Sequence, residues 1–149
     1  MSNYLSKDKQ IVIITRLKMG CDAGEKPLPK YLANFFSEMA KDTGLPLPRN
    51  GDLSPWKDGP IALLSFEELN GYQLYEAVSS RSAMDTPCVF ILMGAQAQDL
   101  KGAVSTKNSH VISVRSCSGY QAGKGFFGSR IFTKACSLLG ISVDCWRLG

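Results

Sequence analysis

Four short apolar runs constrain the fold of this 149-residue chain more than any other feature of its sequence. They occupy residues 10–15, 60–64, 88–93 and 109–114, and they are rich in β-branched side chains. Runs of this length and composition are typical of β-strands. Their apolar residues are nearly continuous instead of alternating with polar ones, so we expect both faces of the resulting sheet to be covered.

Segments with helical spacing lie between and after these runs. Apolar residues recur at helical intervals in 31–39, in 72–78 and in 129–139. In the last segment, Ser129 is placed to cap the start of a helix and Gly140 is placed to end it. The predicted order of elements is therefore strand, helix, strand, helix, strand, strand, helix.

This order predicts an α/β fold. The connections between the strands are too long for hairpins, which favours a small, mostly parallel sheet of four strands that is covered by helices. A chain of 149 residues has the size of one domain, so we expect a single domain over residues 1–149. Open parallel sheets bind ligands in the loops beyond the carboxyl ends of their strands, so we expect any site in those loops.

Composition excludes several classes of protein without identifying an activity. The longest apolar stretches are far shorter than the roughly 18 residues of a membrane span, and the first ten residues are polar, so we expect a cytoplasmic protein with no membrane partner. Five cysteines without a CxxC pair predict reduced, mostly buried thiols, no metal site and no cofactor. The net charge of +4 permits a nucleic-acid partner without requiring one.

Several motifs of the chain resemble those of uracil-DNA glycosylases and occur in the same order. They are KPLPKYLANFFSEM at 26–39, GDLSPW at 51–56, CVFILMGAQAQ at 88–98, HVISV at 110–114 and KGFFGSR at 124–130. The resemblance covers residues 10–148, although the chain is shorter than typical members of that family. It implies a uracil-DNA glycosylase-like, three-layer α/β/α sandwich around a central four-stranded, mostly parallel sheet.

The chain differs from the family at the chemically active positions. The resemblance places the family motif GQDPYH on TRLKMG, so that Leu17 replaces the water-orienting aspartate and Met19 replaces the tyrosine that excludes thymine. Ser65 replaces the asparagine that binds the edge of uracil, and a hydroxyl cannot offer the paired donor and acceptor of an amide. Ser116 replaces the histidine that stabilises the uracil anion. These four residues are the expected remnant of the pocket.

The same comparison predicts that ordinary uracil excision is lost. The segment that carries the family's uracil-stacking phenylalanine is missing between residues 20 and 27. Catalytic groups that act together leave little residual rate when all of them are replaced. A glycosylase for another modified base stays open as an alternative, with new groups supplied by Asp22, Glu67, Ser65 or Cys117. Solvated carboxylates and a structural cysteine are the simpler interpretation of these residues.

The leading hypothesis is a noncatalytic relative that binds DNA or a DNA-associated complex through the former active-site face. The candidate contacts are Lys26, Lys30, Arg115, Ser118, Tyr120, Lys124 and Arg130. Cations on one face would neutralise phosphates and make the affinity depend on salt, and Tyr120 is suited to stack on a base. Against this, Ala95 and Lys30 replace serines of the family's phosphate-binding loops. The alternative is a protein-interaction module, a decoy or an assembly subunit, that does not bind DNA.

The remaining aromatic residues are predicted to pack in the scaffold. Phe126 and Phe127 fall on scaffold positions of the resembling motif, and Trp56 and Trp146 are likewise expected to be structural. His110 is the one histidine of the chain, and the resemblance places it outside the catalytic set. We therefore expect His110 to have a structural role instead of serving as a base.

Overall fold

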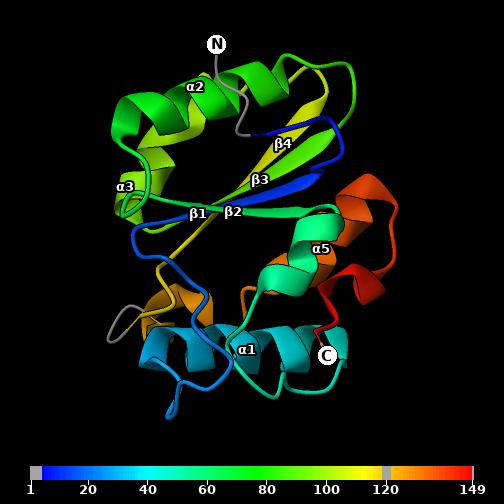
Figure 1. Cartoon of the computed structure of the whole chain (residues 1–149). Coiled ribbons are helices and arrows are strands. Elements are labelled where there is room, and N and C mark those ends of the chain that lie inside the picture. Colours follow the sequence, from blue (N-terminus) through cyan, green and yellow to red (C-terminus); the bar gives the residue numbers. More distant parts are fainter. Residues whose placement is uncertain (1–4, 119–121, 149) are drawn as a thin grey trace.

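A computed structural model describes residues 5–118 and 122–148, and it contains a four-stranded sheet (Figure 1). The strands are β1 (Ile11–Thr15), β2 (Ile61–Ser65), β3 (Cys88–Met93) and β4 (Ser109–Val114). Their order across the sheet is β2-β1-β3-β4, and each pairing is parallel. Ile13 of β1 lies in register with Leu63 of β2 and Ile91 of β3. The four predicted strands are confirmed, in a sheet that is parallel throughout.

The two central strands bury every side chain, which explains their continuous apolar sequence. Successive residues of a strand point to opposite faces of the sheet. Ile11 and Ile13 therefore enter one apolar cluster, while Val12 and Ile14 enter a second cluster on the other face. The expectation that both faces are covered is confirmed.

Helices form the two outer layers. α1 (Lys30–Thr43) and α5 (Ile131–Leu139) pack on one face, and α2 (Gly71–Ser82) and α3 (Ala95–Gln98) pack on the other (Figure 1). Short helical turns at Ser54–Asp58, Asp99–Ala103, Ala122–Phe126 and Val143–Trp146 complete the elements. The predicted three-layer α/β/α sandwich is confirmed. Among the described residues, none of the helices combines the length and apolar character that a bilayer span requires.

Aromatic rings fill the space between the sheet and the helix layer that α1 and α5 form. Phe35 of α1 lies against Phe126, Phe132 and Trp56, with ring centroids 5.1 to 6.3 Å apart. Phe126 is fully buried, as predicted, whereas Phe127 is 47% exposed, so its predicted packing position is wrong. The turn that carries these two adjacent rings directs one of them into the core and the other toward solvent.

Helix α2 forms where it was predicted, but it buries a different face. Tyr72 and Tyr75 are 72% and 49% exposed, whereas Leu74 and Val78 are buried. Asn70 caps the start of the helix by accepting a hydrogen bond from a backbone N–H of the first turn. The two tyrosines have helical spacing, but they lie outside the core. In this position each hydroxyl stays in contact with water.

Helix α5 begins two residues after the predicted start, and Ser129 does not cap it. Arg130 occupies the cap position with a φ of 57°, and the buried Ser129 hydroxyl has no hydrogen-bond partner among the described residues. Carboxylates of α1 bind the free N–H groups instead. Glu38 Oε2 accepts from Arg130 N at 3.1 Å, and Asp42 Oδ2 accepts from Thr133 N at 2.9 Å. The predicted cap is therefore wrong, because the actual caps come from a helix that is distant in sequence.

Candidate functional site

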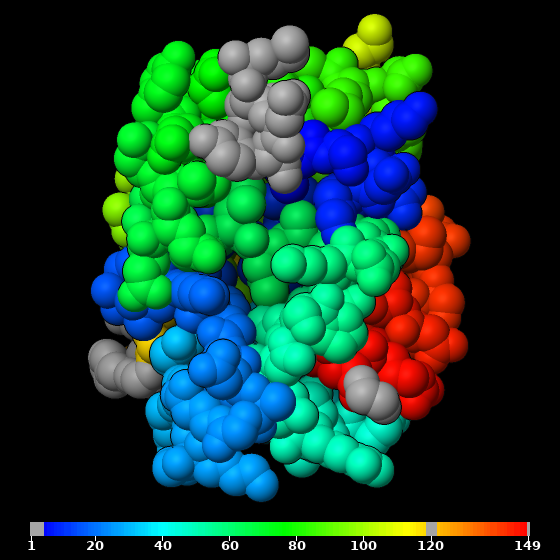
Figure 2. Space-filling view, viewed as in Figure 1, coloured from blue at the N-terminus to red at the C-terminus, as the bar shows by residue number. Residues whose placement is uncertain are grey.

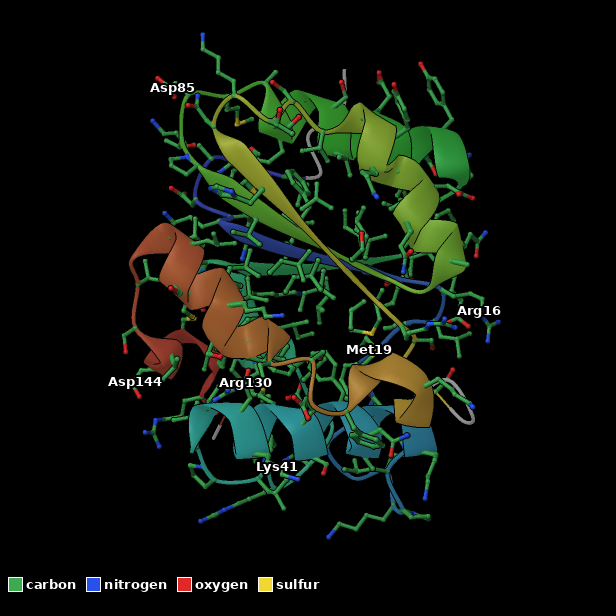
Figure 3. All side chains as sticks on the ribbon, turned by 180° about the vertical axis from the view of Figure 1, so that it is seen from behind. Arg16, Met19, Lys41, Asp85, Arg130 and Asp144 are labelled. Carbon is green, nitrogen blue, oxygen red and sulfur yellow. The ribbon has the colours of Figure 1, made fainter. Side chains whose placement is uncertain are left out.

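The segments that follow the four strands meet beyond the carboxyl ends of the strands, because all four strands run parallel. We call this end of the sheet the strand-end edge. Figure 3 shows Arg16 and Met19 at this edge, with the Arg16 side chain directed outward and Met19 below it, toward α1. Arg16 is exposed, whereas Met19 is 3% exposed. Three cavities of different character lie along this edge.

The first cavity is nearly filled by side chains, with a volume of about 20 Å³, and we call it the closed cavity for that reason. Leu17, Met19 and Ser116 line it, so the structure brings together three of the four predicted pocket residues. Met93 and Cys117 complete its apolar wall, and each is 3% exposed. This volume holds about one water molecule. A nucleobase does not fit there.

Hydrogen bonds from α1 hold the closed loops in place. The Tyr31 hydroxyl donates to Lys18 O at 2.8 Å, and Asn34 Nδ2 donates to Cys117 O at 2.8 Å. Within the last loop, the Ser116 and Ser118 hydroxyl oxygens lie 2.8 Å apart, and Ser118 N donates to Ser116 Oγ. Satisfied polar groups of this kind favour one loop conformation. The closure therefore follows from a bonded network as well as from packed side chains.

The candidate groups for replacement chemistry have structural contacts. Burial raises the pKa of the Cys117 thiol to about 12, so this cysteine is a protonated thiol at neutral pH. Glu67 Oε1 accepts from Lys18 N at 3.1 Å, which joins the loops after β1 and β2. Ser65 is 1% exposed and donates to Glu68 Oε1 at 3.0 Å. Asp22 is exposed. These contacts agree with the simpler, structural interpretation of Cys117 and Glu67.

The second cavity measures about 470 Å³ and runs along the edge strand β2. In Figure 2 it corresponds to the hollow bounded by the segments near residues 20, 55 and 65. Its floor is apolar and includes Met19, Leu53, Trp56 and Leu63, and its rim carries Lys18, Lys57, Asp22, Asp52 and Glu68. Ser65, the fourth predicted pocket residue, lines this cavity and not the first.

The third cavity measures about 550 Å³ and lies between the segments after β1, β3 and β4. Its polar lining consists of Arg16, Arg115, Gln96, Gln98 and Ser116, and no carboxylate is among its lining residues. Two guanidinium groups beside amide and hydroxyl groups form a site suited to an anion. The prediction included Arg115 and missed Arg16, although Arg16 directly follows the β1 run and could have been found by that position.

The stem of Arg115 lies directly over the backbone of Gly125. A Cβ atom at Gly125 would lie 2.7 Å from Arg115 Cγ, which leaves no room for a larger residue. Gln98 Nε2 donates to Val114 O at 3.0 Å, so the β3 and β4 segments are also joined at this cavity. Both contacts involve residues that line the arginine-lined cavity, Arg115 and Gln98.

The other predicted DNA contacts are not all brought together. Lys26, Lys30 and Lys124 are exposed, and Ser118 is half-buried. Tyr120 lies outside the described residues. Arg130 lies 3.7 Å from Asp42, and Figure 3 shows it between α5 and α1, well apart from Arg16. Arg130 is therefore separate from the arginine-lined cavity.

A metal centre finds no support in the described ranges. Over residues 5–118 and 122–148, no three His, Cys, Asp or Glu side chains gather in a way that could hold a metal ion.

Curated proteins similar in sequence are named uracil-DNA glycosylases. One from Mycobacterium sp. (strain KMS) is 35% identical over 148 residues, which cover 89% of this chain and 65% of the relative. One from Mycobacterium bovis (strain BCG / Pasteur 1173P2) is 35% identical over 139 residues, which cover 83% of this chain and 61% of the relative. The chain thus spans slightly less than two thirds of the length of these relatives. No protein-family model matches it.

Solved structures with a similar fold come from mimivirus. A variant of mimivirus UNG in complex with UGI matches with a TM-score of 0.76 and 16% identity, over 98% of this chain and 72% of that one. Mimivirus uracil-DNA glycosylase matches with a TM-score of 0.64 and 19% identity, over 79% and 53% of the two chains. At these identities the likeness establishes a shared fold.

Proposed function

Because this chain is a homologue of the uracil-DNA glycosylases and has their fold, we propose that it binds DNA through the strand-end edge of its sheet without excising uracil. The relatives are named uracil-DNA glycosylases, and the proposed difference from that activity lies in the chemistry of the pocket. Base excision requires an extruded base in a fitted pocket beside catalytic groups. DNA binding requires cations on an accessible face.

The small volume of the closed cavity is the main observation that supports the proposed loss of excision. Met19 and Cys117 occupy the space where the strand-end segments converge, and about 20 Å³ is left between them. Leu17 and Ser116 on the same wall supply neither a carboxylate nor an imidazole. A base would have to displace packed side chains to enter this cavity, and it would lack both groups there.

The arginine-lined cavity supports retained DNA binding. Arg16 and Arg115 line one cavity together with the amides of Gln96 and Gln98, and the described residues that line it include no carboxylate. A DNA phosphate is the anion that suits two guanidinium groups, and side-chain amides are common partners of phosphate oxygens. Exposed Lys124 lies in the turn Ala122–Phe126, next to Gly125, over which the Arg115 side chain packs.

Fluorescence anisotropy with labelled single-stranded and duplex DNA tests the proposal. We expect saturable binding whose logarithmic affinity falls with the logarithm of salt concentration, by about 0.9 per phosphate contact on duplex DNA and about 0.7 on single strands. Absence of binding at low salt would remove the DNA proposal. Incubation with uracil-containing DNA should release no uracil. A panel of other modified bases separates a binding protein from a glycosylase of altered specificity.

A protein-interaction module is the second candidate, favoured by the 470 Å³ cavity beside β2. Ala62, Leu63 and Leu64 of this edge strand are half-buried, and apolar surface at a sheet edge is a common protein contact. The similar mimivirus UNG structure contains the protein UGI. A calorimetric titration with UGI distinguishes the two candidates, because binding of UGI together with no affinity for DNA favours the module.

A further inference from the structure

Two cysteines near the end of the chain lie in contact, away from the strand-end cavities. Cys136 Sγ on α5 lies 3.7 Å from Cys145 Sγ on the short helix Val143–Trp146. Cys136 is 2% exposed, and Cys145 is half-buried. We propose that this pair is an oxidation site, at which a hydroperoxide converts two thiols into a Cys136–Cys145 disulfide that fixes the C-terminal segment to α5.

The local fold holds the two sulfur atoms together. Gly140 ends α5 with a φ of 69°, which reverses the chain so that the next short helix returns beside α5. Cys136 Sγ also donates to Ser142 O at 3.6 Å within the same turn. A disulfide requires a sulfur separation of about 2.05 Å, so the two atoms must approach by about 1.7 Å. Side-chain rotation in an adjoining pair supplies such a movement.

The remaining cysteines lie elsewhere in the fold. Cys88 begins β3 and Cys117 follows β4, and burial raises the pKa of each thiol to about 12. Cys21 lies in the loop after β1. All five cysteines are free thiols in the structure. The contact with a second sulfur therefore distinguishes Cys136 and Cys145 from the three other thiols.

Hydrogen bonding makes Cys136 the more reactive member of the pair. Either sulfur can donate in the Cys136–Cys145 hydrogen bond; with Cys145 as the donor, this bond lowers the pKa of Cys136 below its ordinary value, and the side chain of Trp146 acts in the same direction. The same bond raises the pKa of Cys145, as does its burial. A thiolate is the nucleophile toward a peroxide, so oxidation begins at Cys136.

The reaction proceeds in two balanced steps. The Cys136 sulfur attacks one peroxide oxygen, the O–O bond breaks, and a sulfenic acid and one water form. The Cys145 sulfur then attacks the Cys136 sulfur, the S–O bond breaks, and a second water leaves with the thiol proton. In total, the two thiols lose two electrons and two protons, and hydrogen peroxide is reduced to two water molecules.

The bond would act on the part of the chain that anchors Trp146. This indole is fully buried, donates to Phe132 O at 3.2 Å and packs on the rings of Phe132 and Trp56 at 4.8 and 5.6 Å. Cys145 directly precedes it in the chain. A disulfide that closes the loop from Cys136 to Cys145 would restrain the unfolded chain. We therefore expect the melting temperature to rise by about 5 °C or more.

Peptide mapping of the full chain tests the proposal directly. The protein is treated with hydrogen peroxide, unfolded, alkylated without reduction and digested with trypsin. Both cysteines fall in the tryptic peptide 135–147, because Lys134 precedes it and Arg147 ends it. The disulfide form is unalkylated and two hydrogen atoms lighter than the dithiol. Reduction before alkylation restores two alkylated cysteines, and reduction also reverses the rise in melting temperature.

Matched variants complete the test. Cys145→Ser should leave a sulfenic acid at Cys136 that dimedone traps, and it should abolish the light peptide. Cys88→Ser removes a buried thiol elsewhere and should leave the light peptide unchanged. Alkylation of both cysteines after peroxide treatment, or separate oxidation of each to a sulfinic acid, would overturn the oxidation site. A disulfide that forms without raising the melting temperature would overturn its role in fixing the segment.

Discussion

Two neighbouring cavities at the same edge of the sheet have opposite properties. The closed cavity leaves about 20 Å³, whereas the arginine-lined cavity measures about 550 Å³. They share Arg16, Met93 and Ser116 as a common wall. Within this common wall, Met93 is buried, whereas Arg16 is exposed to solvent.

Under the proposed function, the small cavity accounts for the loss of excision and the arginine-lined cavity accounts for DNA binding. Met19 fills space in the small cavity, at a position where the resemblance implies a polar tyrosine. Arg16 is three residues earlier on the same loop, yet it adds charge at the surface. Binding by phosphate contact depends on position and charge, whereas excision depends on a fitted pocket, so the two properties separate readily.

The largest expected effect comes from emptying the closed cavity. Met19→Ala removes a fully packed side chain and should lower the free energy of unfolding by about 2 to 5 kcal/mol, measured by urea titration. Its affinity for DNA should change by less than about twofold, because the arginines keep their positions. Leu47→Ala, at a residue that is 64% exposed, is the control and should cost less than about 0.5 kcal/mol. An equally small cost for Met19→Ala would contradict the closure.

Charge reversal tests the role of the arginine-lined cavity in DNA binding. Arg16→Glu with Arg115→Glu should weaken DNA binding by about tenfold or more and reduce the salt slope by about two contacts. Lys41→Glu on α1 with Lys134→Glu on α5 is the matched control, because it reverses the same number of exposed charges and Figure 3 shows Lys41 on a helix away from Arg16. Circular dichroism verifies that each variant is folded. Equal losses in the double variant and the control would mean that net charge, and not this cavity, determines the affinity.

Raised pH gives a smaller effect on the closed cavity. Burial raises the pKa of the Cys117 thiol from 9.0 to about 12, so the folded state holds the proton more tightly than the unfolded chain. The stabilisation is present below pH 9 and is lost as the pH rises toward 12. Near pH 10 this thiol should lower the free energy of unfolding by about 1 kcal/mol relative to neutral pH.

Urea titrations at several pH values measure the difference. Cys117→Ala should reduce the dependence on pH without removing it, because Cys88 is buried and its pKa is raised to the same extent. Cys88→Ala is therefore a matched comparison, and the two variants should flatten the curve by similar amounts. A curve that Cys117→Ala leaves unchanged would show that water reaches this thiol in the folded protein.

Most of the fold could be predicted from the sequence because its signals are local. Each strand begins and ends within one residue of a predicted run, and the two central strands are continuously apolar because both of their faces are buried. The start of α5 could not be predicted, because Glu38 and Asp42 cap it from another helix. Likewise, the exposed Tyr72 fits a helical period that says nothing about which face is buried.

The sequence named residues of the candidate site, but it could not give the shape of the site. Leu17, Met19 and Ser116 line one cavity, and no sequence pattern reveals that only about 20 Å³ is left there. Cavity volume depends on side chains from several segments at once. The motif comparison did not single out Arg16, because that comparison identifies positions where a family group has been replaced. Arg16 matters for the cation that it adds.

The smallest expected effect is the return of excision when catalytic groups are restored. Leu17→Asp with Ser116→His supplies a carboxylate and an imidazole, yet we expect no measurable uracil release, because Met19 and Cys117 still fill the cavity. Duplex DNA with one labelled uracil, followed by alkaline cleavage at any abasic site, measures the release. Adding Met19→Ala tests whether space is the limiting factor. Release by the double variant would mean that the cavity opens to admit a base, and release by the triple variant alone would identify Met19 as the barrier.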